Sequence, residues 1–114
     1  MIPEITVEEL SEKLRSQETF ILLDVREPFE LEQASLLDPR LEAVPMSRLA
    51  REGVNALSDA ALDQAGTLYV LCHHGSRSAQ VTGWLAAQGW KNVFSVRGGI
   101  DAYAARIDRA VGFY

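Results

Sequence analysis

Cysteine, histidine and basic residues are scarce in this chain of 114 residues. A single cysteine, Cys72, excludes an internal disulfide, and a metal site would have to combine His73 and His74 with carboxylates. Acidic residues outnumber Lys and Arg by 16 to 11, which gives a net charge of −5. This acidic balance, without a basic stripe, argues against nucleic acid and against an anionic membrane surface as partners.

Long apolar runs and linker-like stretches are missing as well. No window approaches the roughly 18 consecutive apolar residues of a membrane-spanning helix. The N-terminal sequence carries acidic residues where a signal peptide has its apolar segment, so we expect a cytoplasmic protein. No repeat, low-complexity run or Pro/Gly/Ser-rich linker divides the chain, and its length suits one hydrophobic core. We therefore predict a single domain over residues 1–114.

The sequence does contain alternating strand and helix patterns. Apolar runs typical of buried strands occupy residues 20–25, 68–71 and 93–96, with a shorter run at 42–45. Helical spacing and capping residues predict helices at 7–16, 27–32, 47–53, 58–65, 78–88 and 100–111. Thr6 with Glu9 fits a capping box, and Ser47 and Ser58 are the expected caps of two further helices. This alternation predicts an α/β fold with a mainly parallel sheet and helices on both faces.

Three polar segments follow predicted strands at their carboxyl ends, where parallel sheets bind ligands. They are Asp24-Val25-Arg26, the loop that begins at Cys72, and Arg97-Gly98-Gly99. A lone cysteine is more often a buried, inert side chain. The position of Cys72 at such an end favours a reactive thiol instead.

The loop after Cys72 contains residue types that stabilise a thiolate. It leads into a helix, whose N-terminal N–H groups and dipole favour negative charge. Gly75 allows backbone conformations in which successive amides face an anion. Ser76 and Ser78 are placed to cap the helix or donate to a bound anion, and Arg77 is close enough to turn its guanidinium toward the sulfur. Such a thiolate attacks an electrophile while the amides stabilise the anionic adduct.

His73 and His74 leave three readings open. They lie at a pocket rim or modulate the thiolate, one of them acts as a general acid or base, or they bind a metal. The metal reading is the weakest, because adjacent side chains rarely converge on one ion and the chain has no further Cys or His. We predict no metal.

Three stretches together resemble the rhodanese-like domain family, and specifically its single-domain thiosulfate sulfurtransferases. These are residues 22–27 (LLDVRE), 72–78 (CHHGSRS) and 96–103 (VRGGIDAY), in the family's order and at about its spacing. The resemblance implies a compact α/β domain around a central five-stranded parallel sheet. It also implies transfer of a sulfane sulfur through a cysteine persulfide, without a cofactor.

The resemblance assigns roles to the residues of the loop. Cys72 would take the outer sulfur of thiosulfate, or that of a persulfide donor, and pass it to cyanide or a thiol. The acceptor thiol would belong to a small molecule or to a thioredoxin-like or sulfur-carrier protein. The loop from His73 to Arg77 would wrap the persulfide through its N–H groups, and Arg77 matches the position where the family often places a cation for the anionic donor.

The other two matching stretches imply structural support. Asp24 and Arg26 are expected to form a buried ion pair that braces the loop, rather than to take part in the chemistry. Gly98 and Gly99 let the backbone pass close to the site. The segment from Gln33 to Ala43 departs from the family, since it lacks the His and the glycines of a Gly-His-Ile-Pro-Gly-Ala-like stretch. We expect its path to differ and to affect the choice of acceptor.

Two other functions remain as alternatives. A phosphatase or arsenate reductase of related architecture separates Cys and Arg by five residues, whereas four lie between Cys72 and Arg77. The shorter loop favours a cradle sized for one sulfur atom over one sized for a tetrahedral oxyanion. An interaction or regulatory module without turnover commonly lacks the cysteine, which this chain keeps.

Overall fold

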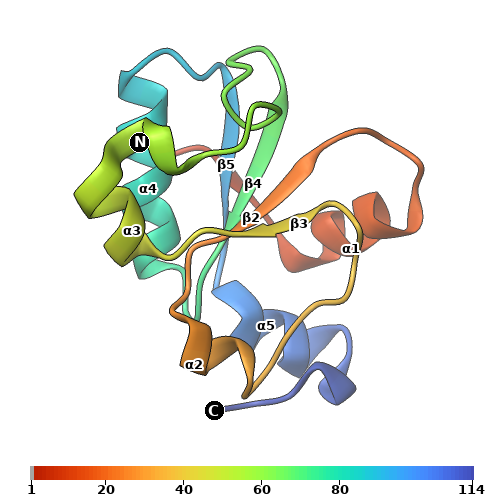
Figure 1. The fold of residues 1–114 in the computed structure, drawn as a ribbon. Coiled ribbons are helices and arrows are strands. Elements are labelled where there is room, and N and C mark those ends of the chain that lie inside the picture. The colour runs from red at the N-terminus through yellow and green to blue at the C-terminus, as the bar shows by residue number, and fades with distance from the viewer. Residues whose placement is uncertain (1) are drawn as a thin grey trace.

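The computed structural model describes residues 2–114 and shows a five-stranded sheet (Figure 1). Its strands are β1 (Glu4–Ile5), β2 (Ile21–Asp24), β3 (Leu41–Ala43), β4 (Thr67–Leu71) and β5 (Asn92–Val96). They lie in the order β1-β5-β4-β2-β3, and every neighbouring pair is parallel. The predicted parallel α/β fold is confirmed. Strand β1 was not predicted, because its two residues are too few to show a period.

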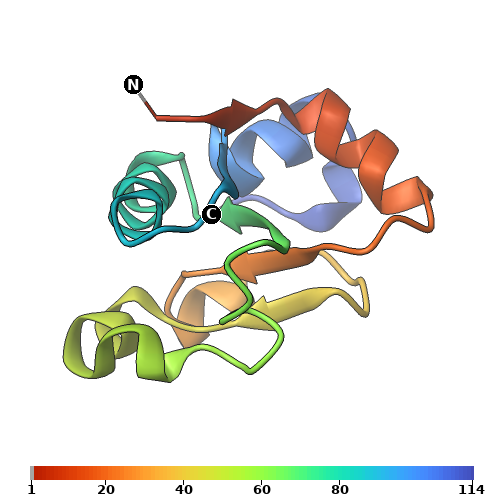
Figure 2. The ribbon, with the colours of Figure 1, turned by 90° about the horizontal axis from the view of Figure 1, so that it is seen from above.

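Helices cover both faces of the sheet (Figure 2). One face carries α1 (Val7–Arg15) and α5 (Gly99–Arg106), and the other carries α3 (Met46–Glu52) and α4 (Ser76–Ala87). The short helix α2 (Pro28–Leu31) lies beyond the carboxyl end of β2, and the 3₁₀ turns η1 (Gly53–Ala56) and η2 (Arg109–Val111) follow α3 and α5. Within residues 2–114 no helix has the length and apolar character to cross a bilayer.

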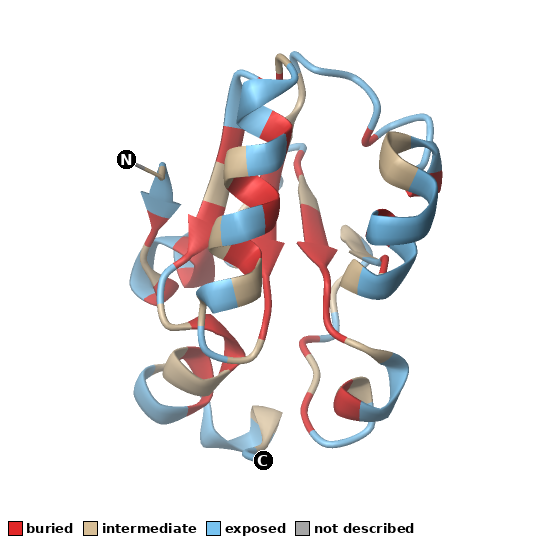
Figure 3. Ribbon diagram, turned by 90° about the vertical axis from the view of Figure 1, so that its left-hand side faces the viewer, coloured by how far each residue is buried: buried red, intermediate tan, exposed pale blue. Residues whose placement is uncertain are grey.

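The central strand β4 supplies side chains to two separate cores. Leu68 and Val70 pack in the core beneath α3 and α4, whereas Tyr69 and Leu71 pack in the core beneath α1 and α5. Figure 3 shows the resulting buried sheet between exposed helix surfaces. Because both of its faces are covered, β4 has a continuous apolar sequence instead of an alternating one.

The capping box of α1 is confirmed. The Glu9 N–H donates to Thr6 Oγ1 over 3.1 Å, and the Thr6 N–H donates to Glu9 Oε1 over 3.0 Å. The helix expected from Ser47 to Gly53 also forms, but its N-cap is Pro45. Ser47 lies within the first turn, where its hydroxyl donates to Glu27 Oε1 over 2.8 Å.

The helix predicted over residues 58–65 is wrong, since this segment forms turns. Ser58 does accept a hydrogen bond from the Ala61 N–H (3.1 Å). The carbonyl of Ala61, however, accepts from Trp90 Nε1 (2.9 Å), and the Ala65 N–H donates to Asp63 Oδ1 (3.0 Å). A helix here would need a hydrogen bond from the Ala65 N–H to the Ala61 carbonyl, and both groups have other partners. A tertiary contact therefore overrides local propensity.

Helical spacing predicts an apolar stripe of Val81, Trp84 and Leu85 along residues 78–88, and this prediction is wrong for Trp84. The buried residues of α4 are Ser78, Val81, Thr82 and Leu85, while Trp84 is 37% exposed. Of the two buried hydroxyl residues, Ser78 contacts the cysteine loop, whereas the Thr82 hydroxyl has no hydrogen-bond partner in residues 2–114. Periodicity alone does not show that Thr82 is buried and Trp84 exposed.

The atypical segment runs from Gln33 to β3 without helix or strand up to Arg40. The Arg40 guanidinium donates to the carbonyls of Leu14 (2.8 Å) and Ser16 (3.1 Å), so it closes the C-terminal end of α1. The Ser35 N–H donates to the Val111 carbonyl over 3.3 Å. These bonds direct the segment toward α1 and η2. Its expected influence on acceptor choice stays a prediction.

The N-terminus of α5 holds the backbone that follows β4. The Ile100 N–H donates to the Cys72 carbonyl (2.9 Å), and the Asp101 N–H donates to the His73 carbonyl (3.1 Å). Gly99 permits this approach, because a Cβ there would collide with both of these carbonyl oxygens. The sheet and α5 together therefore fix the start of the cysteine loop.

Replacing Gly99 by alanine tests this close approach. Gly99 and Gly53 share nearly the same left-handed φ, 63° and 64°, but a Cβ at Gly53 would meet nothing within 4 Å. We expect Gly53→Ala to cost roughly 1 kcal/mol from the backbone alone. Gly99→Ala should cost roughly 2–4 kcal/mol, since steric overlap adds to that strain. Urea unfolding measures both, and equal losses would contradict the steric explanation.

Candidate active site

The three polar segments predicted to meet at one edge of the sheet do so. Asp24 at the end of β2 pairs in register with Leu71 at the end of β4, directly before Cys72. Gly98 and Gly99 follow β5, the other neighbour of β4. A Cβ on Gly75 would come within 3.1 Å of the Gly98 nitrogen, so the third segment closely lines the loop.

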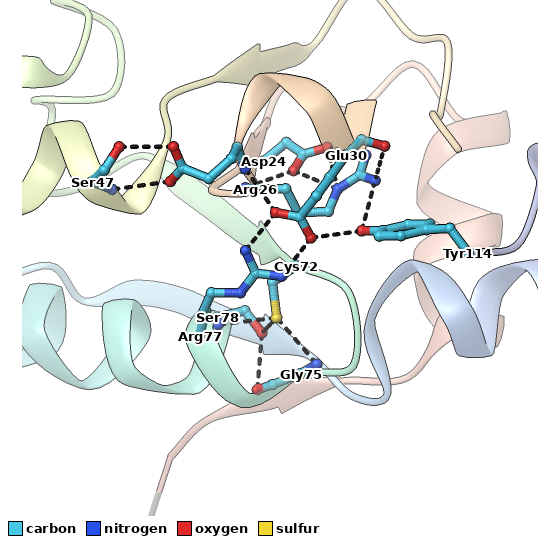
Figure 4. Close-up of polar contacts among 10 residues, drawn as sticks. Asp24, Arg26, Glu30, Ser47, Cys72, Gly75, Arg77, Ser78 and Tyr114 are labelled. Carbon is cyan, nitrogen blue, oxygen red and sulfur yellow. Dashed lines mark hydrogen bonds and ion pairs between the residues drawn. The ribbon is translucent and has the colours of Figure 1, made fainter. Parts of the chain in front are cut away.

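The sulfur of Cys72 accepts hydrogen bonds from two backbone amides (Figure 4). The Gly75 N–H lies 3.1 Å and the Ser78 N–H 3.3 Å from Sγ. Gly75, with a φ of 103°, is the N-cap of α4 and has no side chain to cap it. The sulfur thus takes the place of the capping oxygen that normally accepts from the third residue of a helix. Negative charge on the sulfur is favoured there by the N–H groups and by the helix dipole.

Ser76 and Ser78 differ in their surroundings. Ser76 is exposed at the first residue of α4 and makes no cap. Ser78 is buried, and its hydroxyl lies 3.4 Å from Cys72 Sγ, 2.7 Å from Ser95 Oγ and 3.1 Å from the Gly75 carbonyl. Ser78 therefore braces the loop from inside. Ser95 escaped prediction because it lies within an apolar strand pattern and carries no signal of its own.

The sequence suggested that the guanidinium of Arg77 turns toward the sulfur, but its hydrogen bonds go elsewhere. Its two terminal nitrogens instead donate to the carboxylate of Glu30, Nη1 to Oε2 over 2.7 Å and Nη2 to Oε1 over 2.8 Å. A paired contact of this kind matches the fork of the guanidinium to both carboxylate oxygens, which makes it strong. Glu30 was missed, because a glutamate in a short helix looks like any solvated charge.

Glu30 is held by more than Arg77. Its side chain is only 7% exposed and also accepts from the Glu27 N–H (2.9 Å) and the Tyr114 hydroxyl (3.0 Å). Arg77 above all, then the Glu27 N–H and Tyr114, lower the pKa of Glu30 to about 2, although burial acts to raise it. Glu30 is therefore a carboxylate throughout the physiological range.

Asp24 and Arg26 form the fully buried ion pair that the sequence suggested. Arg26 Nη2 lies 2.8 Å from Asp24 Oδ2, and both side chains are 0% exposed. The same guanidinium donates to the Glu30 carbonyl (3.3 Å) and to the Tyr114 hydroxyl (3.2 Å). It makes no hydrogen bond to Cys72 in residues 2–114, so its geometry supports the structural role.

Tyr114 and the two histidines form a row of rings beside the loop. The Tyr114 ring stacks on His73 with centroids 3.7 Å apart and planes 7° apart, and His73 in turn lies 3.8 Å from His74. Burial, and next the neighbouring His74, keep the pKa of His73 below its usual value. His74 is exposed, with Nδ1 3.8 Å from Asp101 Oδ2.

Donor atoms of His73, His74 and Asp101 all lie within 4.8 Å of one another. The two imidazole rings lie side by side with planes 31° apart. Exposed acidic groups often cluster in this way without an ion, and the expectation that the site holds no metal stays a prediction.

The fold and the site define a parallel α/β protein whose single cysteine is held by loop amides at a helix N-terminus. Comparison with known families names the class more closely. Residues 6–106 match the family described as Rhodanese-like domain, and the chain belongs to that family. The recognition of this family from three short stretches is confirmed.

Three relatives illustrate the likeness. A protein named Sulfurtransferase from Allochromatium vinosum is 34% identical over 91% of this chain and 90% of its own length. The Rhodanese-like/PpiC domain-containing protein 12, chloroplastic, of Arabidopsis thaliana is 36% identical over 99% of this chain. The crystal structure of a rhodanese-related protein from Thermoplasma volcanium superposes with a TM-score of 0.73 at 31% identity, covering 92% of this chain and 93% of that one.

The share of each relative's own length that this chain matches differs among the relatives. This chain spans 38% of the Arabidopsis protein and 54% of a further relative from Bacillus subtilis. It spans nearly all of the Allochromatium protein, so similarity to sulfurtransferases is not confined to larger chains. The Allochromatium protein and a further relative of similar length, from Pseudomonas syringae, are both named as sulfurtransferases.

The ion pair between Glu30 and Arg77 predicts the acid stability of the protein. Because the pKa of Glu30 is lowered from 4.5 to about 2, its stabilisation is complete above about pH 4.5 and is lost as the pH falls toward 2. The loss amounts to at most about 3 kcal/mol, less whatever solvent screens at the partly exposed Arg77.

Glu30→Gln should remove this part of the acid slope, and urea unfolding between about pH 6 and pH 2.5 measures it. Glu32→Gln is the matched control, since Glu32 is exposed and forms no ion pair in residues 2–114. Its slope should equal that of the wild type. An unchanged slope in Glu30→Gln would contradict the assignment.

Proposed function

We propose that the protein is a sulfurtransferase that carries a sulfane sulfur as a persulfide on Cys72. The observation that carries this proposal is the contact of Sγ with two backbone N–H groups at the start of α4. These donors stabilise a thiolate before the reaction and an anionic persulfide after it. The donor is thiosulfate or a persulfide, and the acceptor is a thiol or cyanide.

Both half-reactions are displacements at sulfur. The Cys72 thiolate attacks the outer sulfur of thiosulfate, a new S–S bond forms, and the old S–S bond breaks with its electron pair leaving on sulfite. The acceptor thiolate then attacks the outer sulfur of the persulfide, and the electron pair returns to Cys72 as the thiolate. No external oxidant or reductant enters either step, because one S–S bond replaces another.

Loop length and charge both favour this chemistry over phosphoryl transfer. Only four residues separate Cys72 from Arg77, and the amides within this loop converge on the sulfur. An oxyanion-binding loop needs a free guanidinium, whereas that of Arg77 already donates to the Glu30 carboxylate. A phosphatase of this architecture would have to bind a phosphate dianion against that carboxylate.

An interaction module without turnover is the remaining alternative. If the two amide contacts of Cys72 were purely structural, a serine at this position would serve as well, because a serine oxygen caps helices well. The thiol at that point therefore supports catalysis. A thioredoxin-like or sulfur-carrier protein, or a small thiol, is the proposed acceptor, in the cytoplasm.

Replacing Cys72 by serine should abolish sulfur transfer while the fold persists, since the hydroxyl can accept the same N–H groups. Thiocyanate formation from thiosulfate and cyanide measures turnover, and circular dichroism checks the fold. After incubation with excess donor, intact-protein mass spectrometry should show a gain of about 32 Da on the wild type, the mass of one sulfur, and none on Cys72→Ser. A wild-type protein that gains no mass with any sulfane donor would sink the proposed function and support the module.

Aryl phosphates should not be hydrolysed. The Cys72 loop offers a sulfur-sized cradle, and Arg77 is engaged by Glu30. Release of a chromogenic phenol from its phosphate ester is the measurement. Sustained turnover that disappears in Cys72→Ser would assign the protein to the phosphatases instead.

A further inference from the structure

The cation expected to receive an anionic donor is already engaged. Both terminal nitrogens of Arg77 donate to Glu30, at 2.7 and 2.8 Å. The Arg77 side chain is 31% exposed, whereas Cys72 beside it is 1% exposed. In Figure 4 the Arg77–Glu30 contact lies close to the sulfur. A donor that needs this guanidinium must compete with the carboxylate.

The carboxylate is difficult to displace. Glu30 accepts from the Glu27 N–H and from the Tyr114 hydroxyl in addition to Arg77. Tyr114 is itself fixed by its stack on His73 and by the Arg26 nitrogen 3.2 Å from its hydroxyl. Charge-assisted bonds of this kind are the strong ones, and moving Glu30 would break several together.

The charges around the sulfur cancel. Arg77 is paired with Glu30, and Arg26 is paired with Asp24. The half-buried His73 has a lowered pKa, which favours the neutral ring. Beyond it, the carboxylate of Asp101 lies 3.8 Å from His74. The side chains around the sulfur, within residues 2–114, therefore offer no uncompensated cation to a donor with two negative charges, such as thiosulfate.

We propose that Glu30, held in place by Tyr114, determines donor specificity by withholding Arg77 from dianions, so that the donor used by this site is an organic sulfane-sulfur compound with at most one negative charge. A thiol persulfide belongs to this class. The inference rests on the proposed persulfide chemistry at Cys72 and names its substrate class. Glu30 touches neither sulfur nor donor, and it acts by positioning and neutralising Arg77.

Benzenethiosulfonate is a suitable probe, because it is a monoanion that yields the same product as thiosulfate. The Cys72 thiolate attacks its outer sulfur, the S–S bond to the sulfonyl group breaks, and benzenesulfinate leaves with the electron pair. Each donor therefore gives the same persulfide and one anionic leaving group. The two donors differ by one unit of charge, so the ratio of their kcat/KM values reports on charge selection.

The experiment measures kcat/KM for both donors in the wild type, Glu30→Gln, Tyr114→Phe and the exposed control Glu32→Gln. In Glu30→Gln the ratio of thiosulfate to benzenethiosulfonate should rise at least about fivefold, mainly through a lower KM for thiosulfate, since the freed guanidinium attracts the dianion more. That KM should also rise more steeply with salt than in the wild type. Tyr114→Phe keeps the ring but loses the hydroxyl, and should shift the ratio in the same direction by a smaller factor.

The outcomes separate this inference from the proposed function. Glu32→Gln removes the same charge from the same segment and should leave the ratio within about twofold of the wild type, because exposed charges are well screened. A ratio unchanged in Glu30→Gln, with both donors affected equally, would overturn the charge-selection role even if Cys72 is loaded normally. Failure of every donor to load the wild type would overturn the proposed function instead. If Glu30→Gln proves unstable, Tyr114→Phe decides, and a ratio equal to that of the wild type then counts against the inference.

Discussion

The buried ion pair between Arg26 and Asp24 is the interaction on which the arrangement of the cysteine loop depends. Fully buried, the Arg26 guanidinium is paired with Asp24 at the end of β2 and donates to the backbone of α2 and to the hydroxyl of Tyr114. Burying an unpaired charge costs several kcal/mol, so the guanidinium keeps these partners close to it. Through Glu30 in α2 and through Tyr114, that constraint extends to Arg77 and His73. One buried charge thus links β2 and α2 with the cysteine loop and with the distant C-terminal residue Tyr114.

The use of sulfur as a helix cap explains why the site lies where it does. A helix N-terminus leaves N–H groups that need an acceptor. At α4 the acceptor is Sγ of Cys72, because Gly75 has no side chain to offer. Stabilising the helix and stabilising charge on the sulfur are therefore the same interaction. The scaffold and the chemistry share a contact, which limits how far either can change alone.

The parts of this protein that the sequence predicted are those set by local or periodic signals. Buried strands such as β4 carry continuous apolar residues, Thr6 and Glu9 form a capping box through three-residue spacing, and Cys72 follows a strand end. The parts that escaped depend on contacts between distant residues. Glu30 and Tyr114 are separated by 84 positions, and neither differs from an ordinary surface residue until the fold joins them. The false helix over residues 58–65 failed for the same reason, since the Trp90 ring takes one of its carbonyls.

The burial of Cys72 has a consequence for the chemical lifetime of any sulfur it carries. Oxidation of cysteine sulfur to its higher acids follows exposure, and this side chain is only 1% exposed. Oxidants and stray thiols in bulk solution therefore reach the sulfur only when side chains move aside. Under the proposed chemistry, a persulfide formed on Cys72 would begin from this shielded position, between capture from the donor and delivery to the acceptor.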